Sequence, residues 1–129
     1  MPQLKTKPRD AKNTPEKVLI VEDNFIIAVE VEKLLRRLGV SETTIVPGVD
    51  AALDQLQDVD YDFVWLDVRL GPDSGIVVAH QLLAAKKPFG FLTGYGEMLR
   101  VEPLFADVPI VAKPFVIEDL AEAMHDLLV

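Results

Sequence analysis

The stretch Val18-Leu19-Ile20-Val21-Glu22-Asp23-Asn24 decides the fold class of this chain. A short, continuous run of branched apolar residues that stops at acidic residues is typical of a strand buried on both faces of a parallel sheet. Similar apolar runs follow at 43–46, 63–66, 89–92 and 108–112. We therefore predict five short strands in one parallel sheet.

The segments between these runs have the pattern of helices. Ile27, Val31, Leu35 and Leu38 fall on one helical stripe, and Asn24 can cap the start of that helix. Further helices are expected over 49–57, after Ser74, over 97–102 and over 117–128, and Leu70-Gly71-Pro72-Asp73 is expected to form a loop. Strands that alternate with helices predict an α/β doubly wound fold, in which a five-stranded parallel sheet carries helices on both faces.

The composition narrows the classes of protein. The chain has 129 residues, a formal charge of −8, no cysteine and 50% hydrophobic residues, which suits one compact domain. The lack of cysteine excludes disulfides and thiolate chemistry. The acidic charge disfavours binding to nucleic acid or anionic membrane, and no apolar run approaches the ~20 residues that span a bilayer. We expect a cytoplasmic protein that is a monomer or a weak dimer.

The first part of the chain differs from the rest. Residues 1–16 contain three prolines, an excess of basic over acidic side chains and few apolar residues. A segment of this composition buries too little apolar surface to fold by itself. We predict a flexible basic N-terminal arm over 1–16, followed by a single domain over 17–129.

Polar side chains stand where four of the expected strands end. Glu22 and Asp23 follow the first strand, Asp67 the third, Thr93 the fourth and Lys113 the fifth. The carboxyl ends of parallel strands share one edge of the sheet, so we expect these side chains to lie together. Three crowded carboxylates raise one another's pKa unless a cation joins them. A hard divalent ion with oxygen ligands, Mg²⁺ in a cell, meets that need.

These groups are the ones that phosphoryl transfer requires. One carboxylate can act as a nucleophile and form an aspartyl phosphate. The ion and the Lys113 ammonium would neutralise charge on the phosphoryl oxygens, and Thr93 would supply a hydroxyl donor. The residues thus predict a site for phosphoryl transfer at this edge of the sheet.

Over residues 17–128 the chain resembles the receiver domains of bacterial two-component response regulators. The resemblance rests on four segments, which are Val18-Leu19-Ile20-Val21-Glu22-Asp23-Asn24, Trp65-Leu66-Asp67, Leu92-Thr93-Gly94 and Ala112-Lys113-Pro114-Phe115. It implies a flavodoxin-like (βα)5 fold. It also implies a domain that is not an enzyme, apart from its own self-catalysed phosphorylation and slow autodephosphorylation.

The resemblance assigns roles to the acidic residues. Asp67 would be the phosphoacceptor, with Glu22 and Asp23 as the acidic pair. Asp23 and Asp67 would bind Mg²⁺ directly, together with the backbone carbonyl of Arg69. Glu22 would act on the ion through water.

The resemblance also assigns roles to the residues after the last two strands, and here the chain departs from the family. Thr93 would follow the phosphoryl group, Lys113 would pair with it, and the Lys113–Pro114 bond is expected to be cis. At Ile110 most receivers carry a Tyr or Phe that swings inward as the threonine engages phosphate. We expect Tyr95 to supply the moving ring in this chain.

A second motif points to a subgroup. Residues 88–96, Pro-Phe-Gly-Phe-Leu-Thr-Gly-Tyr-Gly, are similar to the Pro-Phe-x-Phe-Ala-Thr-Gly-Tyr motif of stand-alone receivers sometimes called the FATGUY family, with Leu92 in place of Ala. Members are associated with phosphorelays, notably in bacterial stress signalling. Arg69 and Tyr95 flank the acceptor at positions that tune the loss of the phosphoryl group in the family, so we predict that both affect its lifetime.

We predict a single-domain response regulator. It would take a phosphoryl group from a sensor histidine kinase or a histidine phosphotransfer protein onto Asp67, and act on a downstream protein partner through about residues 94–115. Two alternatives keep the same fold, namely a phosphate sink that drains a relay and an adaptor that works without phosphorylation. Ile110 keeps the adaptor open, whereas the complete set of acidic, Thr and Lys residues disfavours it.

Two other classes of protein are disfavoured by single positions. An aspartate-nucleophile phosphatase would carry a second Asp two residues after the nucleophile, where this chain has Arg69. A nucleotide- or flavin-binding domain would carry a Gly-rich loop after the first strand, where this chain has Glu22-Asp23-Asn24-Phe25, and those carboxylates would repel a phosphate.

Overall fold

The computed structural model of the chain describes residues 14–70, 73–94 and 103–128. Its central sheet has five parallel strands in the order β2-β1-β3-β6-β7. The strands are β1 (Lys17–Val21), β2 (Glu42–Val46), β3 (Phe63–Asp67), β6 (Phe89–Thr93) and β7 (Ile110–Ala112). The order places β3, which ends in an acidic residue, at the centre of the sheet. The predicted α/β doubly wound fold is confirmed.

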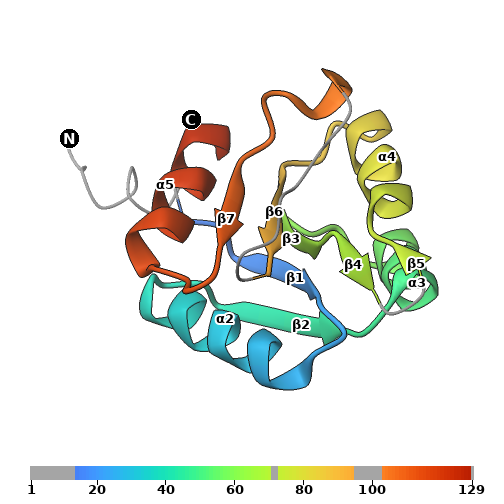
Figure 1. Ribbon diagram of the computed structural model, residues 1–129. Coiled ribbons are helices and arrows are strands. Elements are labelled where there is room, and N and C mark those ends of the chain that lie inside the picture. The colour runs from blue at the N-terminus through green and yellow to red at the C-terminus, as the bar shows by residue number, and fades with distance from the viewer. Residues whose placement is uncertain (1–13, 71–72, 95–102, 129) are drawn as a thin grey trace.

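Helices cover both faces of this sheet (Figure 1). The described residues form four α-helices, namely α2 (Phe25–Arg37), α3 (Val49–Asp58), α4 (Ile76–Ala84) and α5 (Ile117–Leu128). A 3₁₀ turn, η1 (Pro103–Phe105), precedes β7. In Figure 1, α2 and α5 lie on one side of the sheet and α3 and α4 on the other. None of the described helices is long and apolar enough to cross a membrane.

Alternate residues of each strand supply two separate hydrophobic cores. Val18 and Ile20 of β1 pack toward α2 and α5, whereas Leu19 and Val21 pack toward α3 and α4. All four are fully buried, because a strand between two helical layers has no solvent-facing side. This explains why the strand reads as a continuous apolar run rather than an alternating one.

The structure corrects three local expectations. The loop predicted around Leu70 and Asp73 contains a two-stranded antiparallel ladder, β4 (Arg69–Leu70) with β5 (Asp73–Ser74). The last strand begins at Ile110 rather than Val108, since the Val108 N–H donates to the Phe105 carbonyl at 3.0 Å and closes η1. Helix α4 has Gly75 as its N-cap residue and begins at Ile76, instead of directly after Ser74. The helix predicted over 97–102 lies outside the described residues.

The residues directly before β1 are bonded to the sheet. Glu16 was assigned to the predicted arm, yet its N–H donates to Asp62 Oδ2 at 3.0 Å and its carbonyl accepts from the Glu42 N–H at 2.8 Å. The Lys17 N–H donates to the same Asp62 oxygen at 3.0 Å. These bonds fix the amino ends of three strands together, so the folded unit includes Glu16. Residues 1–13 lie outside the described part of the chain.

A tight contact between neighbouring strands fixes the centre of the sheet. Trp65 of β3 is paired with Gly90 of β6, and a Cβ added at Gly90 would lie 2.5 Å from Trp65 Cζ3 and 3.1 Å from Cε3 and Cη2. Trp65 is fully buried and contacts Phe63 at a ring-centroid distance of 5.0 Å. The indole therefore occupies the space that a side chain at position 90 would need.

Substitution of Gly90 tests this contact. We expect Gly90→Ala to lower the free energy of unfolding by about 1–3 kcal/mol, because a buried overlap must be relieved by off-rotamer side chains or a backbone shift. Urea denaturation of the two single variants and the Trp65→Phe/Gly90→Ala double variant measures the coupling. The smaller ring should reduce the cost of the alanine. Equal costs of Gly90→Ala beside Trp65 and beside Phe would contradict the predicted overlap.

Candidate functional site

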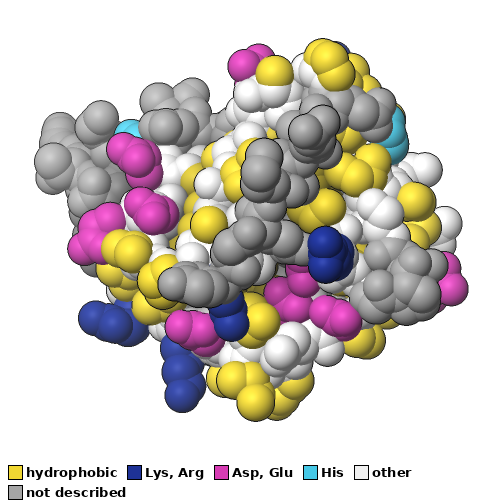
Figure 2. Space-filling view, viewed as in Figure 1, with side chains coloured by type: hydrophobic (Ala, Val, Ile, Leu, Met, Phe, Trp, Pro, Cys, Tyr) yellow, Lys and Arg dark blue, Asp and Glu magenta, His cyan; other side chains and the backbone are white. Residues whose placement is uncertain are grey.

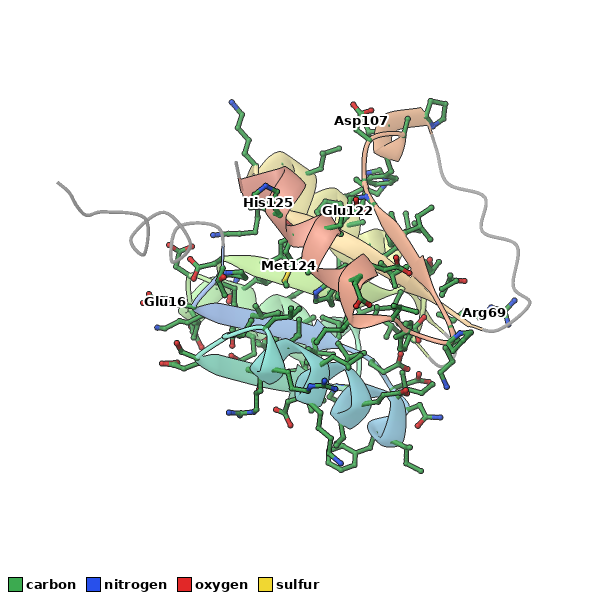
Figure 3. All side chains as sticks on the ribbon, turned by 90° about the vertical axis from the view of Figure 1, so that its left-hand side faces the viewer. Glu16, Arg69, Asp107, Glu122, Met124 and His125 are labelled. Carbon is green, nitrogen blue, oxygen red and sulfur yellow. The ribbon has the colours of Figure 1, made fainter. Side chains whose placement is uncertain are left out.

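The polar residues predicted to meet at the sheet edge do meet there. They surround a cavity of about 310 Å³ at the carboxyl ends of the strands. Its lining residues are Glu22, Asp23, Asn24, Ile27, Asp67, Arg69, Leu92, Thr93, Gly94, Lys113 and Phe115. In Figure 3, Glu16 at the amino end of β1 and Arg69 beyond the carboxyl end of β3 lie at opposite ends of the molecule. Figure 2 shows acidic beside basic side chains near the middle of the face viewed in Figure 1.

Three carboxylates form the acidic part of the site. Glu22, Asp23 and Asp67 each offer one oxygen, and these oxygens lie within 4.8 Å of one another. Glu22 and Asp23 follow β1, and Asp67 is the last residue of β3, the neighbouring strand. Glu22 is buried, Asp67 is half-buried and Asp23 is exposed. Adjacent parallel strands thus bring charges together that are more than 40 residues apart in the sequence.

Glu22 bears the strongest effect of this crowding. Burial, followed by a hydrogen bond with the Asp67 side chain, raises the pKa of Glu22 from 4.5 to about 8. The Asn24 N–H donates to Glu22 Oε2 at 3.0 Å and opposes part of the rise. In the absence of a cation, the raised pKa favours the protonated form of Glu22 at neutral pH, because burial disfavours the charged form and the neighbouring Asp67 adds to this effect.

A local turn fixes the orientation of the Asp67 carboxylate. The Arg69 N–H donates to Asp67 Oδ1 at 3.0 Å. The Gly75 N–H donates to the Val68 carbonyl at 2.7 Å, and Arg69 pairs with Ser74 in the β4–β5 ladder. The chain after Asp67 thus folds back onto the acidic residue within eight positions, and this contributes to a fixed side-chain orientation.

Two further groups face the same cavity from the next two strands. Thr93, the last residue of β6, is buried at 6% exposure, and its carbonyl accepts from the Lys113 N–H at 3.3 Å. Lys113 follows β7 directly, and the Lys113–Pro114 peptide bond is cis, as expected. Thr93 and Lys113 are therefore placed by a backbone contact between neighbouring strands.

The structure describes one of the two residues expected to take part in the switch. Ile110 begins β7 with 45% of its surface exposed, and it is not among the described residues that line the cavity. Tyr95 lies outside the described residues. The sequence reasoning also missed apolar lining residues, namely Ile27, Leu92 and Phe115. For Ile27 a signal was present, since it lies three positions after the N-cap Asn24.

The donor set suits a hard divalent cation. The three ligand atoms that lie close together are carboxylate oxygens, one each from Glu22, Asp23 and Asp67. Mg²⁺ binds such oxygens while it keeps several waters. Burial, together with the neighbouring Asp67, raises the pKa of Glu22 at this point. A dication would favour the ionised forms of all three residues, so the residues present fit Mg²⁺.

Comparisons with known proteins agree with this description. The family model of the response regulator receiver domain matches residues 18–125. The sensory transduction protein LytR of Staphylococcus haemolyticus is 28% identical over 113 residues, which are 84% of this chain and 44% of LytR. The chain thus spans less than half the length of this curated relative.

Solved structures show the same likeness in three dimensions. The solution structure of SdrG from Sphingomonas melonis Fr1 has a TM-score of 0.77 and 37% identity, over 88% of this chain and 96% of SdrG. The PhyR stress response regulator has a TM-score of 0.73 and 30% identity, over 95% of this chain and 48% of PhyR. The α/β fold and the acidic cavity at the carboxyl edge of its sheet agree with these matches. The chain belongs to the response regulator receiver domain family.

The pKa of Glu22 predicts a pH dependence of stability. Between pH 5 and 8 the folded protein keeps the Glu22 proton, whereas the unfolded chain has lost it, so a rise in pH favours unfolding. We expect the metal-free wild type to lose free energy of unfolding across this range relative to Glu22→Gln, on the order of 2 kcal/mol. Urea titrations of both proteins with chelator, at four pH values, measure the difference. Parallel pH profiles would rule out a retained proton at Glu22.

Proposed function

We propose that Asp67 accepts a phosphoryl group from a phosphohistidine of a sensor histidine kinase or a histidine phosphotransfer protein. The observation that carries this proposal is the position of Asp67. Its carboxylate ends the central strand, within 4.8 Å of two further carboxylates, and lines one cavity with the Thr93 hydroxyl and the Lys113 ammonium. A nucleophile, a place for a cation and two donors for phosphoryl oxygens are the parts of a phosphoryl-transfer site.

The transfer needs little beyond positioning. An oxygen of the Asp67 carboxylate attacks phosphorus, the O–P bond forms, and the P–N bond to the donor imidazole breaks. The imidazole leaves with the electron pair and takes up a proton. Thr93 and Lys113, which share the cavity with Asp67, donate to the oxygens of the transferred group. The product stays on the protein, so the domain is a stoichiometric acceptor with slow autodephosphorylation rather than an enzyme.

Mg²⁺ is the cofactor proposed for this site. Asp23, Asp67 and the backbone carbonyl of Arg69 would hold the ion directly, and Glu22 would hold it through water. All four residues line the cavity. When bound, the ion supplies positive charge that offsets the negative phosphoryl oxygens. Asp23, which is exposed, lies where an ion can enter from solvent.

The signalling partners follow from the same chemistry. A domain that only accepts a phosphoryl group acts through proteins, so we infer a downstream protein partner that contacts about residues 94–115. Leu104 and Ile110 are the large apolar residues exposed in the described part of this segment, with 57% and 45% exposure, and they support that surface.

The net charge of −8 supports neither nucleic acid nor anionic membrane as a partner. A role in stress signalling is supported by the likeness to PhyR. A phosphate sink uses the same acceptor chemistry.

Intact-protein mass spectrometry tests the acceptor. Incubation with a small phosphodonor and Mg²⁺ should add the mass of one phosphoryl group to the wild type. Asp67→Asn and chelation of the ion should each abolish the addition, because one removes the nucleophile and the other the compensating charge. Asp54→Asn, which changes an exposed carboxylate on α3, is the matched control. A phosphorylated Asp67→Asn variant, or turnover of external phosphoesters by the wild type, would contradict the proposal.

Arg69 is proposed to shield the phosphoryl group. It lies two residues after Asp67, is exposed and lines the cavity, so its long side chain restricts the approach of water. We expect Arg69→Ala to raise the first-order rate of phosphoryl loss several-fold. Arg37→Ala is the control for a lost surface charge, because Arg37 is an exposed residue at the carboxyl end of α2. The decay of the phosphorylated mass with time measures the rate. Equal lifetimes in both variants and the wild type would remove this role from Arg69.

A further inference from the structure

Helix α4 begins directly against the backbone of the proposed acceptor. Gly75 is its N-cap residue and is buried. The Gly75 N–H donates to the Val68 carbonyl at 2.7 Å, and the Gly75 carbonyl accepts from the Ala79 N–H at 3.0 Å. Gly75 therefore joins the first turn of α4 to the carbonyl group of Val68, the residue that follows Asp67.

The backbone conformation of Gly75 does not require glycine. Its φ of −64° and ψ of −13° lie in the right-handed helical region, which every L residue adopts readily. A residue with a side chain would therefore be expected to stabilise this position by restricting the unfolded chain. Some other constraint must exclude the side chain.

That constraint is the Asp67 peptide group. A Cβ added at Gly75 would come closer than 3.0 Å to the Asp67 carbonyl oxygen, 3.2 Å from the Asp67 carbonyl carbon and 3.3 Å from Leu66 Cδ1. Real Cβ atoms essentially never approach another atom within 3.0 Å. Two of the three contacts are to backbone of Asp67 itself, so no side-chain rotation relieves them. By contrast, a Cβ at Gly48, the N-cap of α3, would meet nothing within 4 Å.

A shift at this point would reach the carboxylate. Asp67 is held on its strand side, where β3 pairs with β6 at Leu92, and on its loop side, where the Arg69 N–H donates to Oδ1 at 3.0 Å. The overlap must therefore be relieved by rotation of the peptide between Asp67 and Val68 or by retreat of α4. Rotation of this peptide changes the backbone from which the Asp67 side chain is aimed into the cavity. Retreat of α4 instead lengthens the bond from the Gly75 N–H to the Val68 carbonyl, which holds the chain directly after Asp67.

We propose that Gly75 is a positioning residue for Asp67: the absence of a side chain lets α4 pack on the Asp67 carbonyl and fixes the direction of the acceptor carboxylate. This inference rests on the proposed role of Asp67 as phosphoacceptor. It assigns to Gly75 an effect on the rate of phosphorylation that is separate from its effect on stability.

Three variants separate the two effects. We expect Gly75→Ala, kept well below its melting temperature, to reduce the limiting rate constant of phosphorylation at saturating small phosphodonor and Mg²⁺ by about 10- to 100-fold, the cost of a misplaced reacting group. Gly48→Ala, the same change at another helix N-cap, should keep the wild-type rate constant. Tyr61→Phe removes a hydroxyl that donates to Gln55 Oε1 at 2.6 Å, away from the residues that line the cavity. It should lower the melting temperature and leave the rate constant unchanged.

A measurement on the wild type covers the case in which Gly75→Ala does not fold. In ¹H–¹⁵N spectra, beryllofluoride with Mg²⁺ should shift the Gly75 amide signal strongly and the Gly48 signal little, because only the first residue packs on the Asp67 peptide. An unshifted Gly75 signal, or a Gly75→Ala protein that is folded and phosphorylated at the wild-type rate, would overturn the inference. A wild type that is itself not phosphorylated would instead overturn the proposed role of Asp67.

Discussion

The crowding of three carboxylates at one edge of the sheet is the constraint on which this molecule depends. Parallel pairing of β1 with β3 brings Glu22, Asp23 and Asp67 within 4.8 Å of one another. In water such groups would repel weakly, but burial of Glu22 strengthens the effect and raises its pKa to about 8. The fold thus maintains three carboxyl groups that are costly to ionise together until positive charge arrives, and this makes the site responsive to a cation and to a phosphoryl group.

An unfavourable site needs a stable frame. Here the frame is the pair of hydrophobic cores on the two faces of the sheet, with all of Val18, Leu19, Ile20 and Val21 fully buried. The apolar core residues of each strand precede its carboxyl end. The charged residues of the site lie at that end: Asp67 is the last residue of β3, and Glu22 and Lys113 directly follow β1 and β7. Stability and function are therefore separated along each strand, a division that lets a protein keep a strained or crowded site at the cost of part of its total stability.

The sequence predicted the strands, their parallel arrangement and the residues that meet at their ends, because buried strands have a continuous apolar signal and chain direction decides which ends coincide. It could not predict the ladder of Arg69–Leu70 with Asp73–Ser74, since two residues per strand carry no periodic signal. Nor could it show that Glu22 is 4% exposed. The Glu22 N–H also donates to the Val46 carbonyl at 3.0 Å, so the pairing of β1 with β2 continues one residue beyond the strand and keeps Glu22 against the sheet.

This chain has Ile110 at the position where most receivers carry a Tyr or Phe ring, yet its acidic site still contacts the neighbouring elements of the domain. Ile110 is an exposed, branched aliphatic residue at the start of β7, and it has no group that could bond to the Thr93 hydroxyl. Thr93 is linked instead through its carbonyl to the Lys113 N–H. On the other side of the sheet, α4 packs on the Asp67 peptide through Gly75, and His80 of α4 contacts Phe105 of η1 at a ring-centroid distance of 5.1 Å. Backbone and helix contacts, rather than a single rotating ring, join the acidic site to the neighbouring surface in the described part of the chain.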